Sequence, residues 1–195
     1  MRLFVALDID DVIRGRIARF LDGVRGFAPD ARWVRPESLH VTLKFIGEKP
    51  EEEVEKIKRA LGAIEAPMFE MSFRGHGFFP GARAPRVFWL GIEGGPKLTS
   101  LAATVDATLA QLDIPKEEHV FNPHLTLARG AGGSGSRRGR KGEGPKQGFQ
   151  LVQEKLAALL SLEFGTMTAR EFFLYRSQLS PAGSKYTQLA GFALR

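Results

Sequence analysis

The sequence predicts an α+β fold of two similar lobes that face one cleft. Two observations point to it: strand and helix patterns alternate along the chain, and one short histidine-containing segment occurs once in each half. With 195 residues, 43% of them hydrophobic, the chain can bury one substantial core. We therefore expect residues 1–195 to form a single domain.

The first half opens with a strand over residues 2–9, a run rich in apolar, β-branched and aromatic residues. Apolar residues at helical spacing predict a helix over 10–27, and a strand over 38–46 follows. Pro50 and the acidic residues after it predict a helix over 51–61, because proline and negative charge favour a helix start. The pattern is strand, helix, strand, helix.

The second half repeats the alternation of strands and helices, with a Gly/Pro turn after its first strand. Alternating or β-branched runs predict strands over 69–79, 86–92, 124–128, 161–164, 171–178 and 185–194. Apolar stripes predict helices over 96–112 and 149–160.

Composition limits the partners and the compartment. The formal net charge of +6 and the pI of about 9.8 favour anionic partners such as nucleic acid. The sequence has no cysteine, which excludes disulfides and thiolate metal sites and allows a reducing compartment. No run reaches the roughly 18 apolar residues of a membrane span, and the N-terminal run is too short for a signal peptide. We expect a cytoplasmic protein with no membrane partner.

Two of the four histidines lie in near-copies of one segment, Leu-His-Val-Thr-Leu and Pro-His-Leu-Thr-Leu. His40 and Thr42, like His124 and Thr126, are two residues apart, so on a strand each pair projects from one face. The apolar residues between them then point into the core and anchor the strand. Two such strands facing each other would place two imidazoles and two hydroxyls around one small anion. The spacing therefore predicts a phosphate-sized site.

The residue types in this site suit in-line displacement at phosphorus. One imidazole can activate the nucleophile while the other protonates the leaving oxygen, because the imidazole pKa of about 6.5 allows both charge states near neutral pH. Threonine hydroxyls can donate to the non-bridging oxygens as their charge grows. Neither segment has a second histidine or a carboxylate at metal-ligand spacing. We expect no metal and no cofactor.

The chain resembles the two-histidine phosphoesterase superfamily, and within it the RNA 2′,3′-cyclic phosphodiesterases first described as 2′-5′ RNA ligases (LigT/ThpR-like). The resemblance implies a bilobal fold, with antiparallel sheets and outer helices around a central cleft. It covers nearly the whole chain, and the residues that carry it are 2–6, Trp33, 39–47, 121–129, Tyr186 and Leu189.

The resemblance also implies a role for each site residue. His40 would be the proton donor to the leaving 3′ oxygen, and His124 the proton acceptor that activates water. Thr42 and Thr126 would bind the phosphate oxygens, and Arg129 would add a positive charge beside them. The substrate would be an RNA with a 2′,3′-cyclic phosphate end, the product a 2′-phosphate, and the reverse reaction a 2′-5′ ligation. We expect a monomer.

Two alternatives stay open. The same site could act on a small cyclic nucleotide, ADP-ribose 1″,2″-cyclic phosphate or a 2′-5′ oligonucleotide, as relatives in the superfamily do. A non-catalytic module that binds RNA ends is the other alternative, although binding alone would not require an imidazole on both sides. The sequence does not rank the substrates.

Several residues outside the paired motifs carry weaker expectations. The glycine-rich, basic segment 130–148 is expected to be a flexible loop, which either holds RNA phosphates or only keeps the surface solvated. His119 is a candidate substrate contact, whereas His76 lacks a threonine partner and is interpreted as structural. Trp33 and Phe45, beside the first motif, are candidate base contacts, although most such aromatics fill cores.

Overall fold

Two antiparallel sheets form the framework of the protein. Our computed structural model describes residues 1–130, 148–159, 161–180 and 183–195. In these ranges a four-stranded sheet has the order β3-β1-β8-β9, and a five-stranded sheet has the order β2-β6-β5-β4-β7. The first contains β1 (Arg2–Leu7), β3 (Val41–Glu48), β8 (Glu171–Ser180) and β9 (Gly183–Ala193). The second contains β2 (Arg32–Trp33), β4 (Phe69–Phe79), β5 (Val87–Glu93), β6 (His124–Arg129) and β7 (Glu163–Ala169).

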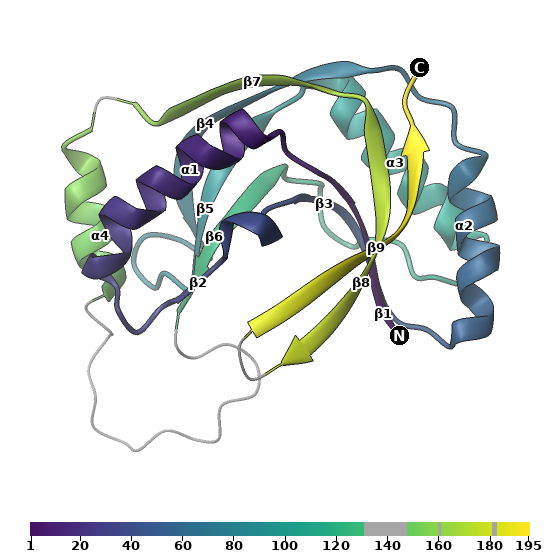
Figure 1. Cartoon of the computed structure of the whole chain (residues 1–195), viewed down its shortest axis with the longest axis horizontal. Helices are drawn as coiled ribbons and strands as arrows, with labels where there is room; N and C mark the ends of the chain where they lie inside the picture. The colour runs from purple at the N-terminus through teal and green to yellow at the C-terminus, as the bar shows by residue number, and fades with distance from the viewer. Residues whose placement is uncertain (131–147, 160, 181–182) are drawn as a thin grey trace.

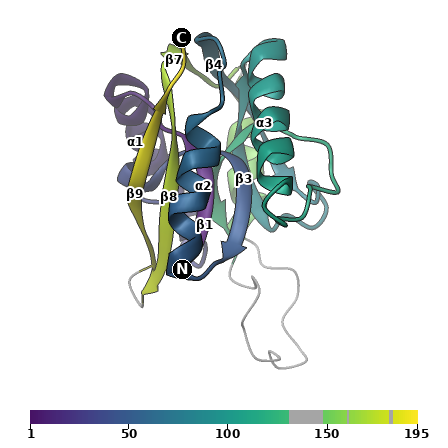
Figure 2. The same cartoon turned by 90° about the vertical axis from the view of Figure 1, so that its right-hand side faces the viewer.

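Helices that follow a strand of one sheet pack against the other sheet. They are α1 (Asp11–Val24), α2 (Val54–Gly62), α3 (Gly95–Ala110) and α4 (Gly148–Ala157). Helix α1 follows β1 of the four-stranded sheet but contacts β7 of the other, and α3 follows β5 but contacts α2 and β3. Figure 1 shows α1 and α4 beside the five-stranded sheet and α2 and α3 at the opposite end, and Figure 2 looks onto that end. The two lobes are therefore interlocked, and one cluster of buried apolar side chains runs through both.

The helices form where the sequence indicates. Asp10 caps α1, because its carboxylate accepts a hydrogen bond from the backbone N–H of Ile13 at 2.8 Å. Ile13, Ile17 and Leu21 repeat every fourth residue and form the buried face of that helix. None of the helices in the described ranges is long and apolar enough to cross a membrane.

The α+β prediction is confirmed, with four differences in detail. The strand expected over 38–46 begins only at Val41, so His40 lies just before β3 and follows a 3₁₀ turn at Pro36–Ser38. The two-residue strand β2 was too short to leave an alternating pattern. The strand expected over 161–164 begins only at Glu163 and is longer, because β7 pairs with β4 as far as Ala169. Of the loop expected over 130–148, residues 131–147 lie outside the described ranges, whereas Gly148 is the first residue of α4 and not part of a loop.

A buried ion pair connects β3 to the segment that leads into β6. Lys44 is only 2% exposed. Its ammonium group donates to Asp106 Oδ1 and to the backbone oxygen of Pro115, both at 2.6 Å, and lies 3.6 Å from Glu117. Burial alone would raise the pKa of Asp106, but hydrogen bonds from Lys44 and from the backbone of Glu117 hold it below its ordinary value.

Replacing Lys44 with methionine is expected to lower the free energy of unfolding by about 1–3 kcal/mol, because the partly buried Asp106, 22% exposed, would lose the cation that donates to it. Urea unfolding measures the change. Lys58→Met is the matched control, since the exposed Lys58–Glu55 pair, 2.8 Å apart, should contribute about 0.5 kcal/mol or less. Equal losses in the two variants would contradict a structural role for the buried pair.

Candidate active site

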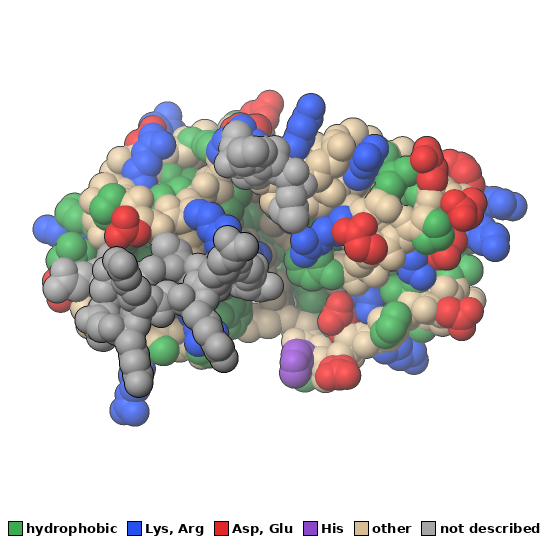
Figure 3. Space-filling model, turned by 90° about the horizontal axis from the view of Figure 1, so that it is seen from below, with side chains coloured by type: hydrophobic (Ala, Val, Ile, Leu, Met, Phe, Trp, Pro, Cys, Tyr) green, Lys and Arg blue, Asp and Glu red, His purple; other side chains and the backbone are tan. Residues whose placement is uncertain are grey.

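The two histidine-threonine segments meet where the sheets approach each other. β3 lies at one edge of the four-stranded sheet, and it contacts β6 of the five-stranded sheet. Viewed from below, the molecule is hollowed near its centre, with Lys or Arg side chains on both sides of the hollow (Figure 3). We call the space between the two motif strands the cleft, and the sheet faces that carry the motif histidines the cleft faces.

Each motif histidine makes the same kind of hydrogen bond, to the backbone oxygen two residues before it. His40 Nδ1 lies 2.8 Å from the backbone oxygen of Ser38, and His124 Nδ1 lies 2.8 Å from that of Asn122. A carbonyl oxygen can only accept, so Nδ1 carries the hydrogen in both rings. The proton that each imidazole gains or loses is therefore the one on Nε2. Both rings thus present the same atom for acid–base chemistry.

Aromatic rings fix the orientation of each imidazole. The centroid of the His40 ring is 4.8 Å from that of Phe4 and 5.0 Å from that of Tyr186, which meets it edge to face. The His124 ring lies edge to face with Phe79 at 5.2 Å. Packing of this kind restricts the rotamers of a catalytic side chain, so both rings are held in place before a ligand arrives.

The wall behind His124 depends on a glycine. Trp89 stacks on Phe79 with centroids 5.2 Å apart, and its indole ring fills the place where a side chain at Gly77 would be. A Cβ atom added to Gly77 would lie 2.2 Å from that ring. Glycine at this position therefore permits the close approach of Trp89 to β4.

The environment of His40 favours its neutral form. Burial lowers the pKa of this imidazole, and the hydrogen bond to Ser38 and the negative charge of Asp8 only partly oppose that effect. The positive charges of Arg129 and Arg14 lower the pKa further. Because Arg129 lies on β6, its charge acts on His40 from the other sheet, across the cleft.

The lowered pKa of His40 makes the stability of the protein pH-dependent. Between that pKa and the ordinary value of 6.5, the unfolded chain binds more protons than the folded one. The free energy of unfolding should therefore rise with pH across this window and fall as the pH drops below 6.5. We expect His40→Gln to flatten this slope in urea unfolding measured at about pH 5 to 7.

His76 limits how far the slope can flatten. Burial also lowers the pKa of His76, so a residual slope of the same sign should persist in the His40 variant. His76→Gln is the matched substitution and should remove only that residual part of the wild-type slope. A slope that is the same in the His40 variant and in the wild type would contradict the role of His40.

A β-bulge brings Arg129 to the cleft face. Thr126 lies opposite Trp89, but Ala128 rather than Leu127 lies opposite the neighbouring residue of β5. The extra residue shifts the alternation of side chains by one. Arg129 is five residues from His124, so a regular strand would point it to the opposite face, whereas the bulged strand returns it to the face of Thr126.

The same bulge occurs at the same place in the first motif. Thr42 lies opposite Ala6, but Lys44 rather than Leu43 lies opposite the neighbouring residue of β1. As a result Lys44 points inward, and Phe45 returns to the cleft face. Phe45 is therefore the counterpart of Arg129, three residues beyond the threonine in each motif.

Sequence reasoning missed Arg14, which supports the turn that carries His40. The guanidinium of Arg14 donates to the backbone oxygen of Pro36 and to Asp8 Oδ1, both at 2.6 Å, and more weakly to the backbone oxygen of Leu39 at 3.4 Å. It thereby ties α1 and the end of β1 to the residues just before His40. On a helix with an ordinary polar face, no local pattern distinguishes this arginine from solvated ones.

Trp33 does not contact the cleft, so its interpretation as a base contact is wrong. Its indole Nε1 donates to the backbone oxygen of Ala28 at 3.0 Å, and its ring packs edge to face against the buried Phe88 at 6.1 Å. Its partner on β6 is the buried Ala128, which faces the core. By contrast, Phe45 is 56% exposed.

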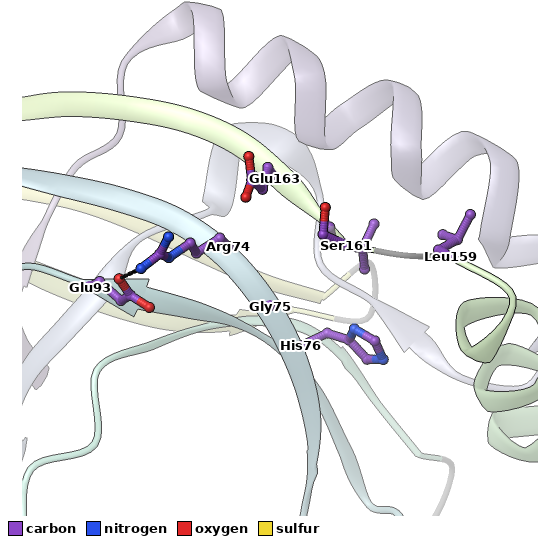
Figure 4. Close-up of a pocket in the computed structure, with 8 residues that line it drawn as sticks. Arg74, Gly75, His76, Glu93, Leu159, Ser161 and Glu163 are labelled. Atoms are coloured by element: carbon purple, nitrogen blue, oxygen red, sulfur yellow. Dashed lines mark hydrogen bonds and ion pairs between the residues drawn. The ribbon is translucent and has the colours of Figure 1, made fainter.

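A separate pocket of about 450 Å³ surrounds His76, with Arg74, Glu93, Ser161 and Glu163 in its wall (Figure 4). Arg74 is already paired with Glu93, as the dashed line in Figure 4 marks. No motif residue lines this pocket. In the part of the chain that the structure describes, no three His, Cys, Asp or Glu side chains are grouped so that they could hold a metal ion.

The known proteins that resemble this chain in sequence agree with the family model that it matches. The family model of LigT-like phosphoesterases matches residues 7–89. The RNA 2′,3′-cyclic phosphodiesterase of Archaeoglobus fulgidus is 35% identical over 192 residues, which cover 98% of this chain and 99% of that protein. The enzyme of the same name from Methanothermobacter thermautotrophicus is 33% identical over 198 residues, covering 100% of this chain and 99% of that protein.

Solved structures agree with the sequence comparison. The crystal structure of the Thermus thermophilus protein TT0787 superposes with a TM-score of 0.77 at 32% identity, and covers 100% of this chain and 98% of that one. Escherichia coli LigT complexed with 3′-AMP superposes with a TM-score of 0.74 at 27% identity, over 99% of this chain and 97% of that one.

Proposed function

Because this chain belongs to the LigT-like phosphoesterase family, we propose that it hydrolyses the 2′,3′-cyclic phosphate at RNA ends to a 2′-phosphomonoester. Full-length relatives named RNA 2′,3′-cyclic phosphodiesterase support this substrate. The observation that carries the proposal is the pair of histidine-threonine segments on contacting strands, each histidine held through Nδ1 by the same backbone hydrogen bond.

In the proposed reaction the two imidazoles act on opposite sides of the phosphorus. His124 Nε2 takes a proton from a water molecule, which attacks in line, while protonated His40 gives its Nε2 proton to the leaving 3′ oxygen. The hydroxyls of Thr42 and Thr126 donate to the non-bridging oxygens, and Arg129 offsets their growing negative charge. The products are an RNA 2′-phosphate and a free 3′ hydroxyl.

The acid role of His40 requires that it become charged when the substrate binds. Its lowered pKa in the ligand-free protein disfavours the imidazolium ion. A phosphodiester anion bound beside the ring favours that ion again, since an opposite charge within about 4–6 Å raises the pKa of an imidazole. Substrate binding and protonation of His40 are therefore coupled in this proposal.

Two extensions belong to the same proposal. The reaction needs no metal, because the two imidazoles supply both proton transfers. Run in reverse, the same two groups join a 2′,3′-cyclic end to a 5′ hydroxyl and form a 2′-5′ linkage. We further propose that residues 1–195 act as a single-domain monomer in the cytoplasm, where a sequence without cysteine is compatible with the reducing conditions.

The test is incubation of an RNA bearing a 2′,3′-cyclic phosphate with the protein in excess EDTA, followed by identification of the product. Formation of a 2′-phosphate is the expected result. A matched RNA with a linear 3′-phosphate is the control and should be unchanged. Absence of turnover, turnover that appears only after a metal is added, or a 3′-phosphate product would each overturn the proposal.

A further inference from the structure

Arg14 holds the 3₁₀ turn before His40 from both sides. Its Nη1 atom donates to the backbone oxygen of Pro36 at 2.6 Å and, more weakly, to that of Leu39 at 3.4 Å. Between these two carbonyl groups lies that of Ser38, whose oxygen accepts the hydrogen bond from His40 Nδ1 at 2.8 Å. Arg14 therefore fixes the peptide groups on either side of the oxygen that orients the imidazole.

Asp8 holds the guanidinium of Arg14 in place. Its Oδ1 atom accepts from Arg14 Nη2 at 2.6 Å and from the backbone N–H of Ile9 at 2.8 Å, and Nη2 also donates to the backbone oxygen of Ile9 at 2.9 Å. The Arg14 side chain is only 17% exposed. Because a guanidinium presents its donors as a planar fork, one nitrogen binds the end of β1 while the other binds the turn.

Three charges and two tyrosine rings face the imidazole of the first motif. The negative charge is that of Asp8, just after β1, and the positive charges are those of Arg14 on α1 and Arg129 on β6. Tyr175 on β8 and Tyr186 on β9 lie with their ring centroids 6.3 Å and 5.0 Å from that of the imidazole. Burial raises the pKa of Tyr175 to about 12, so its hydroxyl stays protonated where an imidazole titrates. Of these three charges, only that of Asp8 favours the imidazolium ion.

Backbone pairing, by contrast, holds the residue before His124. The backbone oxygen of Pro123 accepts from the N–H of Ile92 in β5 at 3.3 Å. In the first motif, the pairing of β1 with β3 begins only at Val41, one residue after His40. A side-chain ion pair therefore supports the first imidazole at a point that the strand ladder does not reach.

We propose that Arg14 and Asp8 form a positioning pair for His40, in which the guanidinium keeps the hydrogen of the ring on Nδ1 and the carboxylate anchors the guanidinium and favours the charged ring. This inference rests on the proposed function, because it states how the acid of that reaction is prepared. Both residues act through the imidazole, so their loss should affect kcat more than KM.

Arg14→Met tests the geometry. In the protein without substrate, NMR of isotope-labelled imidazole nitrogens reports which ring nitrogen carries the hydrogen. With the turn released, His40 should populate the tautomer with its hydrogen on Nε2. For the cyclic-phosphate RNA, kcat should fall about tenfold while KM stays within about twofold of the wild type. Arg14→Lys keeps the charge but not the planar fork, so it should recover only part of both effects.

Asp8→Asn tests the charge. Asparagine keeps an oxygen that can accept from Arg14, so the tautomer of His40 should not change. The pKa of His40 should fall, because the negative charge that favours the imidazolium ion is lost. The alkaline limb of kcat/KM should then move to lower pH. Asp11→Asn is the matched control, since its carboxylate lies 3.7 Å from Arg14 Nε but is fully exposed, and the pKa of His40 should stay as in the wild type.

Arg16→Met is the matched control for Arg14→Met. Arg16 lies on the same helix and donates to the backbone oxygen of Phe164 at 2.9 Å, so its loss should leave the tautomer of His40 and kcat unchanged. His124 is an internal reference, because its hydrogen should stay on Nδ1 in every variant. If His124 changed as much as His40 in Arg14→Met, or if neither changed, the positioning role would be wrong.

These measurements separate the inference from the proposed function, because the tautomer and the pKa are read without substrate. If both change as expected but the cyclic RNA is not turned over, the proposed function fails and the positioning pair stands. If the RNA is turned over while His40 keeps its tautomer in Arg14→Met and its pKa in Asp8→Asn, the positioning pair is wrong and the proposed function stands.

Discussion

Replacing either His40 or His124 by alanine is expected to lower kcat/KM for the cyclic-phosphate RNA by about a thousandfold or more. Proton transfer by a positioned side chain contributes about 10²–10⁴-fold, and each variant loses one of the two transfers. Because the two groups act in one step, the double variant should lose little more than either single one. Initial rates at several substrate concentrations, with circular dichroism to verify the fold, give the measurement.

His76→Ala is the matched control for these variants, since His76 lies in the separate pocket on β4 and should keep near-wild-type turnover. A motif variant that retained turnover within a few-fold of the wild type would remove that histidine from the mechanism.

The pH profile of kcat/KM distinguishes the acid from the base. If His40 is the acid, kcat/KM should fall as the pH rises through the lowered pKa of His40, because the protonated imidazole is then lost. The alkaline limb of the profile should therefore begin below pH 6.5.

Replacing Arg129 by methionine is expected to lower kcat by about a hundredfold, the second-largest effect that we predict. Removing one preorganised donor from a site of developing charge costs about 10²–10³-fold in kcat. The prediction depends on the bulge at Leu127, which returns Arg129 to the cleft face, and on its charge acting on His40 from the other sheet. Steady-state kinetics with the cyclic-phosphate RNA measure the effect.

Two variants define what the Arg129 result means. Arg19→Met, on the exposed face of α1, removes the same charge from a residue outside both motifs and should change kcat by less than about twofold. Arg129→Lys keeps the charge but loses the planar pair of donors, so it should recover only part of the rate. If Arg129→Met affected KM alone, the guanidinium would bind the RNA strand and not stabilise the transition state.

Period-two alternation predicted the local arrangement of the second motif correctly, whereas His40 of the first motif lies just before its strand. His124 and Thr126 lie opposite Gly91 and Trp89 on β5, so they share a face, as residues two apart on a strand must. The same alternation predicts the wrong face for Arg129, three residues after Thr126. Leu127 is apolar like any core residue of a strand, and nothing in its type marks it as the extra residue of a bulge.

The sequence by itself determined the helices, the strands apart from β2, and the paired motifs, because each depends on periodicity or spacing within a few residues. It also contained the signal for the proposed acid–base pair, since near-identical segments rarely recur by chance. Only the tertiary structure decided that β3 and β6 touch, that Lys44 turns inward while Phe45 and Arg129 face the cleft, and that Arg14 supports His40. These features depend on pairing between distant strands, and the register of such pairing is set by the packing of the whole chain.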